Sequence, residues 1–227
     1  RAAHAIARVP GNADAFLIVG GESPANAPSN EAILTEDRGA SFVSSSALVF
    51  SQGGREYTAL VATGPTTFIA FGGTGTGGYF NDVRRSINLG VVWNTIRGNG
   101  GYGGDSCADS AIWSARSSMA YAYMPLRNRI LLAGGTGSAP VYKQDVWGSD
   151  DGGTCWSLLT ADSDGTATNG YASASLVVAT SGGVEILVLA GGTAPVVNRL
   201  SSVYRSLDAG VTWLVVASSG PMWPARS

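Results

Sequence analysis

The octet at residues 206–213 reads Ser206-Leu207-Asp208-Ala209-Gly210-Val211-Thr212-Trp213. An Asp side chain at the start of a turn can accept hydrogen bonds from backbone N–H groups a few residues later, and Gly supplies the positive φ that reverses the chain. The Trp then adds a large apolar face that holds the two flanking strands together. The octet therefore predicts a tight hairpin between two strands.

The same octet occurs three more times in less complete form, so the chain contains an internal repeat. The central Asx residues of the four octets are Asp37, Asn88, Asp151 and Asp208. Each lies 15 or 16 residues after the second Gly of a Gly-Gly pair, and these glycines are Gly21, Gly73, Gly135 and Gly192. Each pair follows a short apolar run. A register that holds four times indicates one repeated structural unit.

A third mark opens each repeat. Arg1, Arg55 and Arg116 stand 20, 18 and 19 residues before the second Gly, and Gly170-Tyr171 takes this place in the fourth repeat. The last residues, Trp223-Pro224-Ala225-Arg226-Ser227, resemble Trp113-Ser114-Ala115-Arg116-Ser117. These marks place the repeats at residues 1–54, 55–115, 116–169 and 170–225, with residues 226–227 opening a fifth. We expect either a segment of a larger chain or an unusually small ring.

Each repeat contains four short strand patterns. In the first repeat they cover His4–Val9, Phe16–Gly20, Ala32–Thr35 and Ser41–Ser45. Four strands in a unit of about 50 residues are typical of a propeller blade. The continuous apolar runs Leu176–Val178 and Ile186–Leu189 favour inner strands that are covered on both faces. We therefore predict a single all-β propeller over residues 1–227, built of four-stranded antiparallel blades.

Composition excludes several classes of function. The chain has 227 residues, of which 13% are charged and 32 are Gly, and its net charge is −2. This balance disfavours a helical bundle and provides no field that would attract nucleic acid. The longest apolar stretch is interrupted well before the ~20 residues that span a bilayer, so we expect no membrane insertion. One His and two Cys are too few for a zinc site with four Cys or His ligands, and we expect no metal and no cofactor.

The motifs resemble two known repeat families. The Gly-Gly pair after an apolar strand, Asp145-Val146-Trp147 and the later Trp156 resemble the kelch repeat, many units of which open with an Arg and a His, as Arg1 and His4 do here. The octets resemble the Asp box of sialidases and other secreted β-propellers. This resemblance implies that the octets lie at the blade periphery, away from the mouth where substrates bind. We therefore expect a structural role for Asp37, Asn88, Asp151, Asp208, Trp93, Trp156 and Trp213.

Protruding loops are the candidates for binding, because blade cores are fixed by packing. The Gly-rich segments are Thr74–Phe80 and Arg97–Ser110, and Asp162–Asn169 is a polar connector. No phosphate-loop Lys follows the glycines, and these segments join strands, so surface contacts are favoured over a phosphate cradle. The candidate contact residues are Tyr79, Tyr102 and Tyr142.

Three further residues have two interpretations each. Cys107 and Cys155 would form a disulfide if the loop before the third blade folds over the outer hairpin of that blade, which would indicate an oxidising compartment. Two buried thiols are the alternative. We expect His4 to be a buried, hydrogen-bonded strand residue rather than a catalytic base, because it falls within the repeated pattern.

The sequence does not assemble a catalytic site. We therefore expect a noncatalytic scaffold or recognition module for protein or carbohydrate, extracellular or at the cell surface, with packing of many copies into a larger assembly as a further expectation. The alternative is a sialidase-like glycoside hydrolase. Arg8-Val9-Pro10 resembles the Arg-Ile-Pro near the start of sialidases, in which the Arg helps to hold a carboxylate. An intracellular kelch adaptor is a third interpretation.

Overall fold

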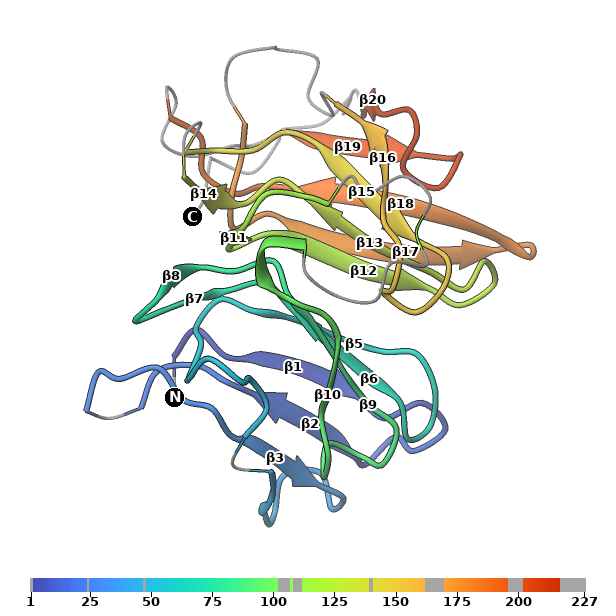
Figure 1. Cartoon of the computed structure of the whole chain (residues 1–227). Helices are drawn as coiled ribbons and strands as arrows, with labels where there is room; N and C mark the ends of the chain where they lie inside the picture. The colour runs from blue at the N-terminus through green and yellow to red at the C-terminus, as the bar shows by residue number, and fades with distance from the viewer. Residues whose placement is uncertain are drawn as a thin grey trace. The chain divides into compact units, whose positions relative to one another are not determined.

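The computed structural model describes residues 2–23, 25–46, 48–101, 107, 112–138, 141–161, 170–195 and 202–216. Over these residues the chain forms four four-stranded antiparallel sheets, and each sheet lies within one repeat (Figure 1). The helical content of this described part is a single 3-10 turn, η1 (Asn99–Gly101). The prediction of an all-β propeller with four-stranded antiparallel blades is confirmed. In the same residues, no helix has the length and apolar character needed to cross a membrane.

Each blade is an up-and-down meander in which consecutive strands of the chain are neighbours. The first blade contains β1 (Ala5–Arg8), β2 (Phe16–Val19), β3 (Ala32–Thr35) and β4 (Val43–Ser46). The second contains β5 (Ala59–Ala62), β6 (Phe68–Phe71), β9 (Val83–Ser86) and β10 (Asn94–Arg97). The third contains β12 (Ala120–Met124), β13 (Arg129–Ala133), β15 (Val146–Ser149) and β16 (Ser157–Thr160). The fourth contains β17 (Ser175–Ser181), β18 (Val184–Ala190), β19 (Val203–Ser206) and β20 (Leu214–Val215).

Short strands accompany the blades. These are β7 (Thr74–Gly75) and β8 (Gly78–Tyr79), which pair as a small hairpin, and β11 (Arg116–Ser117) and β14 (Thr136–Gly137). The pairing of the third with the fourth strand is shifted in register in the first three blades, at β3–β4, β9–β10 and β15–β16. A bulge of this kind bends the outer strand and increases its twist.

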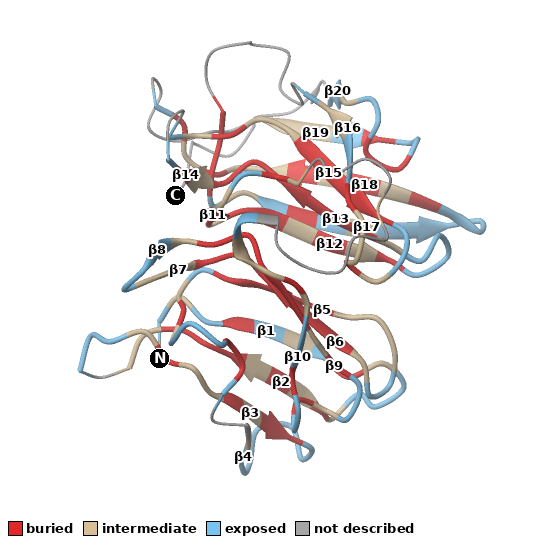
Figure 2. Ribbon diagram, in the orientation of Figure 1, coloured by how far each residue is buried: buried red, intermediate tan, exposed pale blue. Residues whose placement is uncertain are grey.

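The chain divides into two compact units, each with its own core. The first comprises Arg1–Ser117 and Gly152–Cys155, and the second comprises Ser118–Asp151 and Trp156–Ser227. The first core includes Leu17, Val19, Phe50, Leu60 and Phe68, and the second includes Met124, Leu131, Val146, Leu187 and Leu189. Figure 2 shows that buried residues gather on middle strands such as β6 and β13, whereas the outer strand β20 is exposed. Middle strands contribute most because both of their faces are covered.

A buried ion pair joins the Arg that opens the second repeat to Asp82 in the first unit. The guanidinium group of Arg55 is fully buried and donates two hydrogen bonds to the carboxylate of Asp82, one of them from Nη2 to Oδ2 at 2.9 Å. The rings of Phe50 and Phe80 lie 4.4 and 3.7 Å from the guanidinium carbon. The opening Arg of a repeat is thus held by a carboxylate 27 residues later and by cation–π contacts.

Two expectations about burial are wrong. His4 is exposed and lies immediately before β1, because side chains alternate along a strand and the neighbouring Ala5 faces the core. The run Leu176–Val178 is not covered on both faces, since Leu176 is buried whereas Val177 is 56% exposed. β17, the first strand of the fourth blade, therefore packs against the core on one side only. Residues at the start of this strand also line the groove described below.

Candidate functional site

The octet of the fourth blade is a closed hydrogen-bonded turn. The hydroxyl group of Ser206 donates to Asp208 at 2.8 Å and accepts from the N–H of Gly210 at 2.9 Å. The Asp208 carboxylate also accepts from the N–H and the hydroxyl of Thr212, at 2.8 and 2.5 Å. The indole N–H of Trp213 donates to the Gly210 carbonyl at 3.1 Å. The polar groups of the turn thus satisfy one another, and the Trp closes it from one side.

The other octets repeat this arrangement. In the second blade the side chain of Asn88 accepts from the N–H of Val92 at 2.9 Å, and the indole N–H of Trp93 donates to the Gly90 carbonyl at 2.9 Å. In the third, the Ser149 hydroxyl donates to Asp151 at 2.9 Å. Trp93 and Trp156 are buried, whereas Trp213 is half-buried. Asn can therefore replace Asp in this turn, because the accepting oxygen is what the turn requires.

Hydrogen bonds within the turns stabilise the charged form of two carboxylates. The side chain and backbone N–H of Ser41 and the hydroxyl of Thr35 lower the pKa of Asp37 to about 2. Partial burial acts to raise the pKa of Asp208, but the hydrogen bonds from Thr212 and Ser206 together outweigh it, so this pKa also lies below its ordinary value. Carboxylates held as anions by their own turn are poor proton donors at neutral pH. Each of the two carboxylates is thus held as an anion by hydrogen bonds within its own turn.

A disulfide joins Cys107 to Cys155, with their Cα atoms 5.6 Å apart. Beside it, the buried guanidinium of Arg97 donates to the carbonyl of Thr154 at 3.1 Å and lies 3.7 Å from the sulfur of Cys107. Both the covalent bond and the hydrogen bond attach the turn Gly152–Cys155 to the first unit. The structure thus contains the first of the two arrangements that the sequence left open for these cysteines.

The candidate contact tyrosines have different surroundings. Tyr79 is half-buried in β8, and Tyr142 is half-buried beside an isolated bridge to Thr136. Tyr102 lies outside the described residues, as do Asp162–Asn169 and most of the segment after η1. A binding role for these residues stays a prediction.

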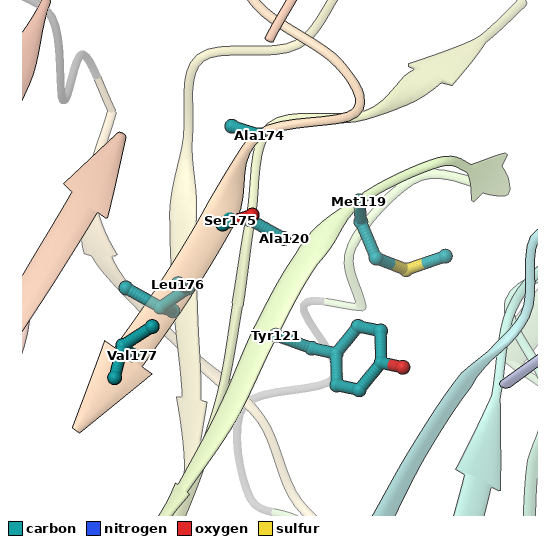
Figure 3. Close-up of a pocket in the computed structure, with 7 residues that line it drawn as sticks. All are labelled: Met119, Ala120, Tyr121, Ala174, Ser175, Leu176 and Val177. Atoms are coloured by element: carbon teal, nitrogen blue, oxygen red, sulfur yellow. The ribbon is translucent and has the colours of Figure 1, made fainter. Parts of the chain in front are cut away.

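An open groove lies between the first strands of the third and fourth blades. It has a volume of about 330 Å³ and lies between β12 and β17 (Figure 3). The lining residues are Met119, Ala120, Tyr121, Ala174, Ser175, Leu176 and Val177. Figure 3 shows Tyr121 on β12, with Met119 just before this strand, and Leu176 and Val177 on β17. The lining side chains are therefore mainly hydrocarbon, with hydroxyl groups contributed by Ser175 and Tyr121.

Sequence reasoning did not single out this groove. The residues that line it come from two places more than 50 positions apart, each just after the mark that opens a repeat, and those marks gave no indication of a groove. The apolar run at Leu176–Val178 was the available signal, but the other half of the groove could be found only once β12 was placed beside β17.

Catalytic groupings are not evident in the described part of the chain. Arg8, the residue that resembles a sialidase Arg, is exposed at the end of β1, where it pairs in register with Phe16. Among the described residues, no group of three or more His, Cys, Asp or Glu side chains could hold a metal ion.

Comparison with known proteins supports the propeller fold. Residues 115–225, which span the third and fourth blades, match the model of the DUF6242 beta propeller domain. No curated protein matches the chain. The third and fourth repeats are thus similar to a known propeller domain, and the protein is a β-propeller of small antiparallel blades.

Proposed function

We propose that this protein is a noncatalytic recognition module whose binding surface is the groove between β12 and β17. The observation that carries the proposal is this groove, which places exposed hydrocarbon at the junction of two blades. Val177 on β17 is 56% exposed there, and Tyr121 on β12 is half-buried. Propellers bind partners at surfaces held by rigid sheets, and β12 and β17 are each hydrogen-bonded into a complete blade.

The lining favours an apolar side chain of a protein partner as the occupant. The seven lining residues include no charged side chain, so a sugar would leave most of its hydroxyl groups without partners. A volume of about 330 Å³ is at the small end for ligand pockets and suits one or two side chains of a peptide. The hydroxyl groups of Ser175 and Tyr121 would orient the peptide backbone. Carbohydrate binding, with the Tyr121 ring as a stacking platform, is the second candidate.

The test is selection from a displayed library of random peptides against the full chain, followed by titration of the selected peptides. We expect enrichment of peptides with aromatic or branched apolar residues. Val177→Asp should weaken their binding at least about tenfold, because a charge in an apolar contact loses its hydration. The matched control is Val184→Asp, which changes a valine of similar exposure, 52%, outside the groove.

Other outcomes would contradict the proposal. Equal effects of the two Val→Asp substitutions would remove the groove from the binding surface, and binding confined to a glycan array would favour the carbohydrate candidate. Hydrolysis of a sialoside substrate that is lost in Arg8→Ala would instead make the protein a sialidase-like hydrolase.

We also assign the octet turns to the Asp-box type and the Arg-opened repeats to the kelch type, and we place the protein outside the reducing cytosol. The hydrogen bonds of Asp208 support the Asp-box assignment, and the Arg55–Asp82 pair supports the kelch assignment. The Cys107–Cys155 bond supports a location outside the reducing cytosol, because disulfides persist in oxidising compartments. Mass spectrometry of alkylated protein from its native source should find both cysteines unmodified before reduction. Alkylation without reduction would favour the intracellular adaptor.

A further inference from the structure

The first strand of the fourth blade, β17, has one edge that is not paired with another strand. Within the described residues β17 pairs with β18 alone, and it lies at the end of its sheet in the order β17-β18-β19-β20. It is also longer than the first strands of the other blades, with seven residues against four in β1 and β5 and five in β12. The free edge begins at the groove, because Ser175, Leu176 and Val177 belong to both.

The hairpin turn decides which backbone groups face this edge. Gly182 and Gly183 form the loop between β17 and β18, with φ of 58° and 78°. Two positive values are typical of a type I′ turn, which is closed by a hydrogen-bonded pair, here Ser181 and Val184. Hydrogen-bonded and non-hydrogen-bonded pairs alternate along an antiparallel ladder. The residues of β17 whose N–H and carbonyl groups face away from β18 are therefore Leu176, Val178 and Thr180.

These edge groups are not satisfied within the described part of the chain. Among the described residues, no backbone hydrogen bond outside the strand ladders involves Leu176, Val178 or Thr180. The second half of the strand is open to solvent, since Ala179, Thr180 and Ser181 are exposed (Figure 2). Unpaired backbone groups along a strand edge can bond to an extended chain that lies beside them.

β17 lacks the features that usually protect a free edge. Proteins block such edges with charged side chains, proline or a bulge. β17 reads Ser-Leu-Val-Val-Ala-Thr-Ser, without a charge or a proline, and its pairing with β18 runs without a register shift. By contrast, β1 ends with Arg8 and is soon followed by Pro10, and Pro125 directly follows β12. The edge of β17 is therefore open to pairing with a further strand.

We propose that β17 binds an extended segment of a partner protein along this edge, so that the segment becomes a fifth strand of the fourth blade. The inference rests on the proposed function, because it takes the groove as the binding surface, and it adds that the main chain of the partner is bound as well as its side chains. Side chains of a strand point alternately to its two faces, and the residues that line the groove carry no charge. The partner segment is accordingly uncharged, with an apolar residue at every second position.

The test is amide hydrogen exchange, measured by NMR on the full chain with a capped peptide of alternating Thr and Val residues as the probe. At millimolar peptide, the amides of Leu176, Val178 and Thr180 should exchange at least about tenfold more slowly than without it. The amides of Val177 and Ala179 should not change, because they already bond to β18. Slower exchange at every second residue is the signature of main-chain pairing.

Two substitutions of Thr180 separate main-chain from side-chain recognition. Thr180→Pro removes an N–H that faces the free edge and leaves the bonds to β18 intact, so the dissociation constant of the peptide should rise by about threefold to tenfold. Thr180→Val keeps this N–H and is the matched control, in which binding should be unchanged. Unaltered protection of the Leu187 and Leu189 amides shows that the blade of each variant is folded.

Three results would overturn the proposal. Unchanged exchange at Leu176, Val178 and Thr180 with millimolar peptide would mean that no strand pairs with this edge, and equal effects of the two Thr180 substitutions would mean that side chains alone are bound. In either case peptides selected on the groove could still bind and be weakened by Val177→Asp, and the proposed function would stand by itself. Slow exchange of the three amides without peptide, increasing with protein concentration, would identify a second copy of the chain as the occupant.

The reverse combination separates the two proposals in the other direction. Slower exchange at the three amides, with no effect of Val177→Asp on peptide binding, would retain the paired strand and remove the groove from the binding surface.

Discussion

Four residues at equivalent places in the repeats have left-handed backbone although none is glycine. They are Ala3, Tyr57, Ser118 and Ser173, with φ between 52° and 57°. This conformation costs about 1–2 kcal/mol per L-residue. Two of these residues donate across to the equivalent residue of the preceding repeat, from Tyr57 to Ala3 and from Ser173 to Ser118, each at 2.8 Å. The strain is therefore offset by hydrogen bonds that depend on the reversed backbone.

Relief of this strain should stabilise the fold. Ser173 is exposed, so Ser173→Gly removes the steric cost of positive φ without opening the core. We expect the free energy of unfolding in urea to rise by roughly 0.5–1 kcal/mol, after allowance for the greater flexibility of Gly in the unfolded chain. The control is Ser175→Gly in β17, where the backbone is extended and the same change should destabilise. Equal effects at both positions would show that the positive φ of Ser173 does not lower the free energy of unfolding.

The carboxylate of Asp37 should make stability depend on pH. Its pKa in the folded protein is about 2, because hydrogen bonds from Ser41 and Thr35 favour the anion. An unfolded Asp titrates near 3.9. Since the folded pKa is depressed, the stabilisation is fully present above the unfolded pKa and is lost as the pH falls through the folded value. The loss should therefore occur between about pH 4 and pH 2.

Asp37→Asn tests this dependence, because Asn88 shows that an amide fits the same turn. The variant should lose less stability than the parent between pH 5 and pH 2, as measured from urea midpoints. Asn88→Asp is the reciprocal change and should increase the dependence over the same interval. If Asp37→Asn leaves the pH profile unaltered, its hydrogen bonds do not distinguish the folded from the unfolded chain.

At the scale of elements, the Arg55–Asp82 pair connects the start of one repeat to its third strand. Both side chains are almost completely buried, and removal of one charge leaves the other without a partner in a desolvated site. Asp82→Ala should therefore lower the free energy of unfolding by about 3–5 kcal/mol. The matched control is Asp150→Ala, which breaks the more exposed pair with Arg129 and should cost less than about 1 kcal/mol.

A double substitution separates the pair from simple packing. Arg55→Met with Asp82→Leu keeps apolar volume between Phe50 and Phe80 and leaves no buried charge. It should be more stable than Asp82→Ala in the same urea titration, because apolar replacements of buried pairs are often tolerated. A double variant less stable than the single one would mean that the cation–π contacts, rather than the ion pair, hold this region together.

At the scale of the whole molecule, the disulfide belongs to the first of the two compact units. It closes a loop of 48 residues, and loop-closure entropy for that length corresponds to about 4 kcal/mol. Cys107→Ser with Cys155→Ser should therefore lower the unfolding temperature of the first unit in calorimetry, and reductant should do the same to the parent.

Core substitutions identify the two transitions. Leu17→Ala lies in the first core and Leu187→Ala in the second, and each should shift only its own transition. Loss of the disulfide should move the transition that Leu17→Ala moves. A shift of the other transition, or one merged transition in every variant, would show that the two units do not unfold separately.

The sequence by itself determined the repeat, the blades and the place of the turns. These follow from local chemistry: an Asx side chain and a Gly specify the hairpin at Asp208, and apolar runs before Gly-Gly pairs specify the strands. In the first repeat the predicted strands at residues 16–20 and 32–35 end within one residue of β2 and β3. Short-range hydrogen bonds and side-chain alternation are encoded in neighbouring residues, so they can be found without a structure.

Only the tertiary structure decided which distant residues meet. Three features depend on which strand lies beside which and on the side to which each strand face turns. They are the Arg55–Asp82 pair, the groove between β12 and β17 and the exposure of His4. The contacts of the Gly-Gly pairs are the clearest case. The glycines and the residues that open the repeats were both visible as repeated marks, but the hydrogen bond from the N–H of Gly21 to the carbonyl of Arg55 is a property of how consecutive repeats pack, which no spacing along the chain specifies.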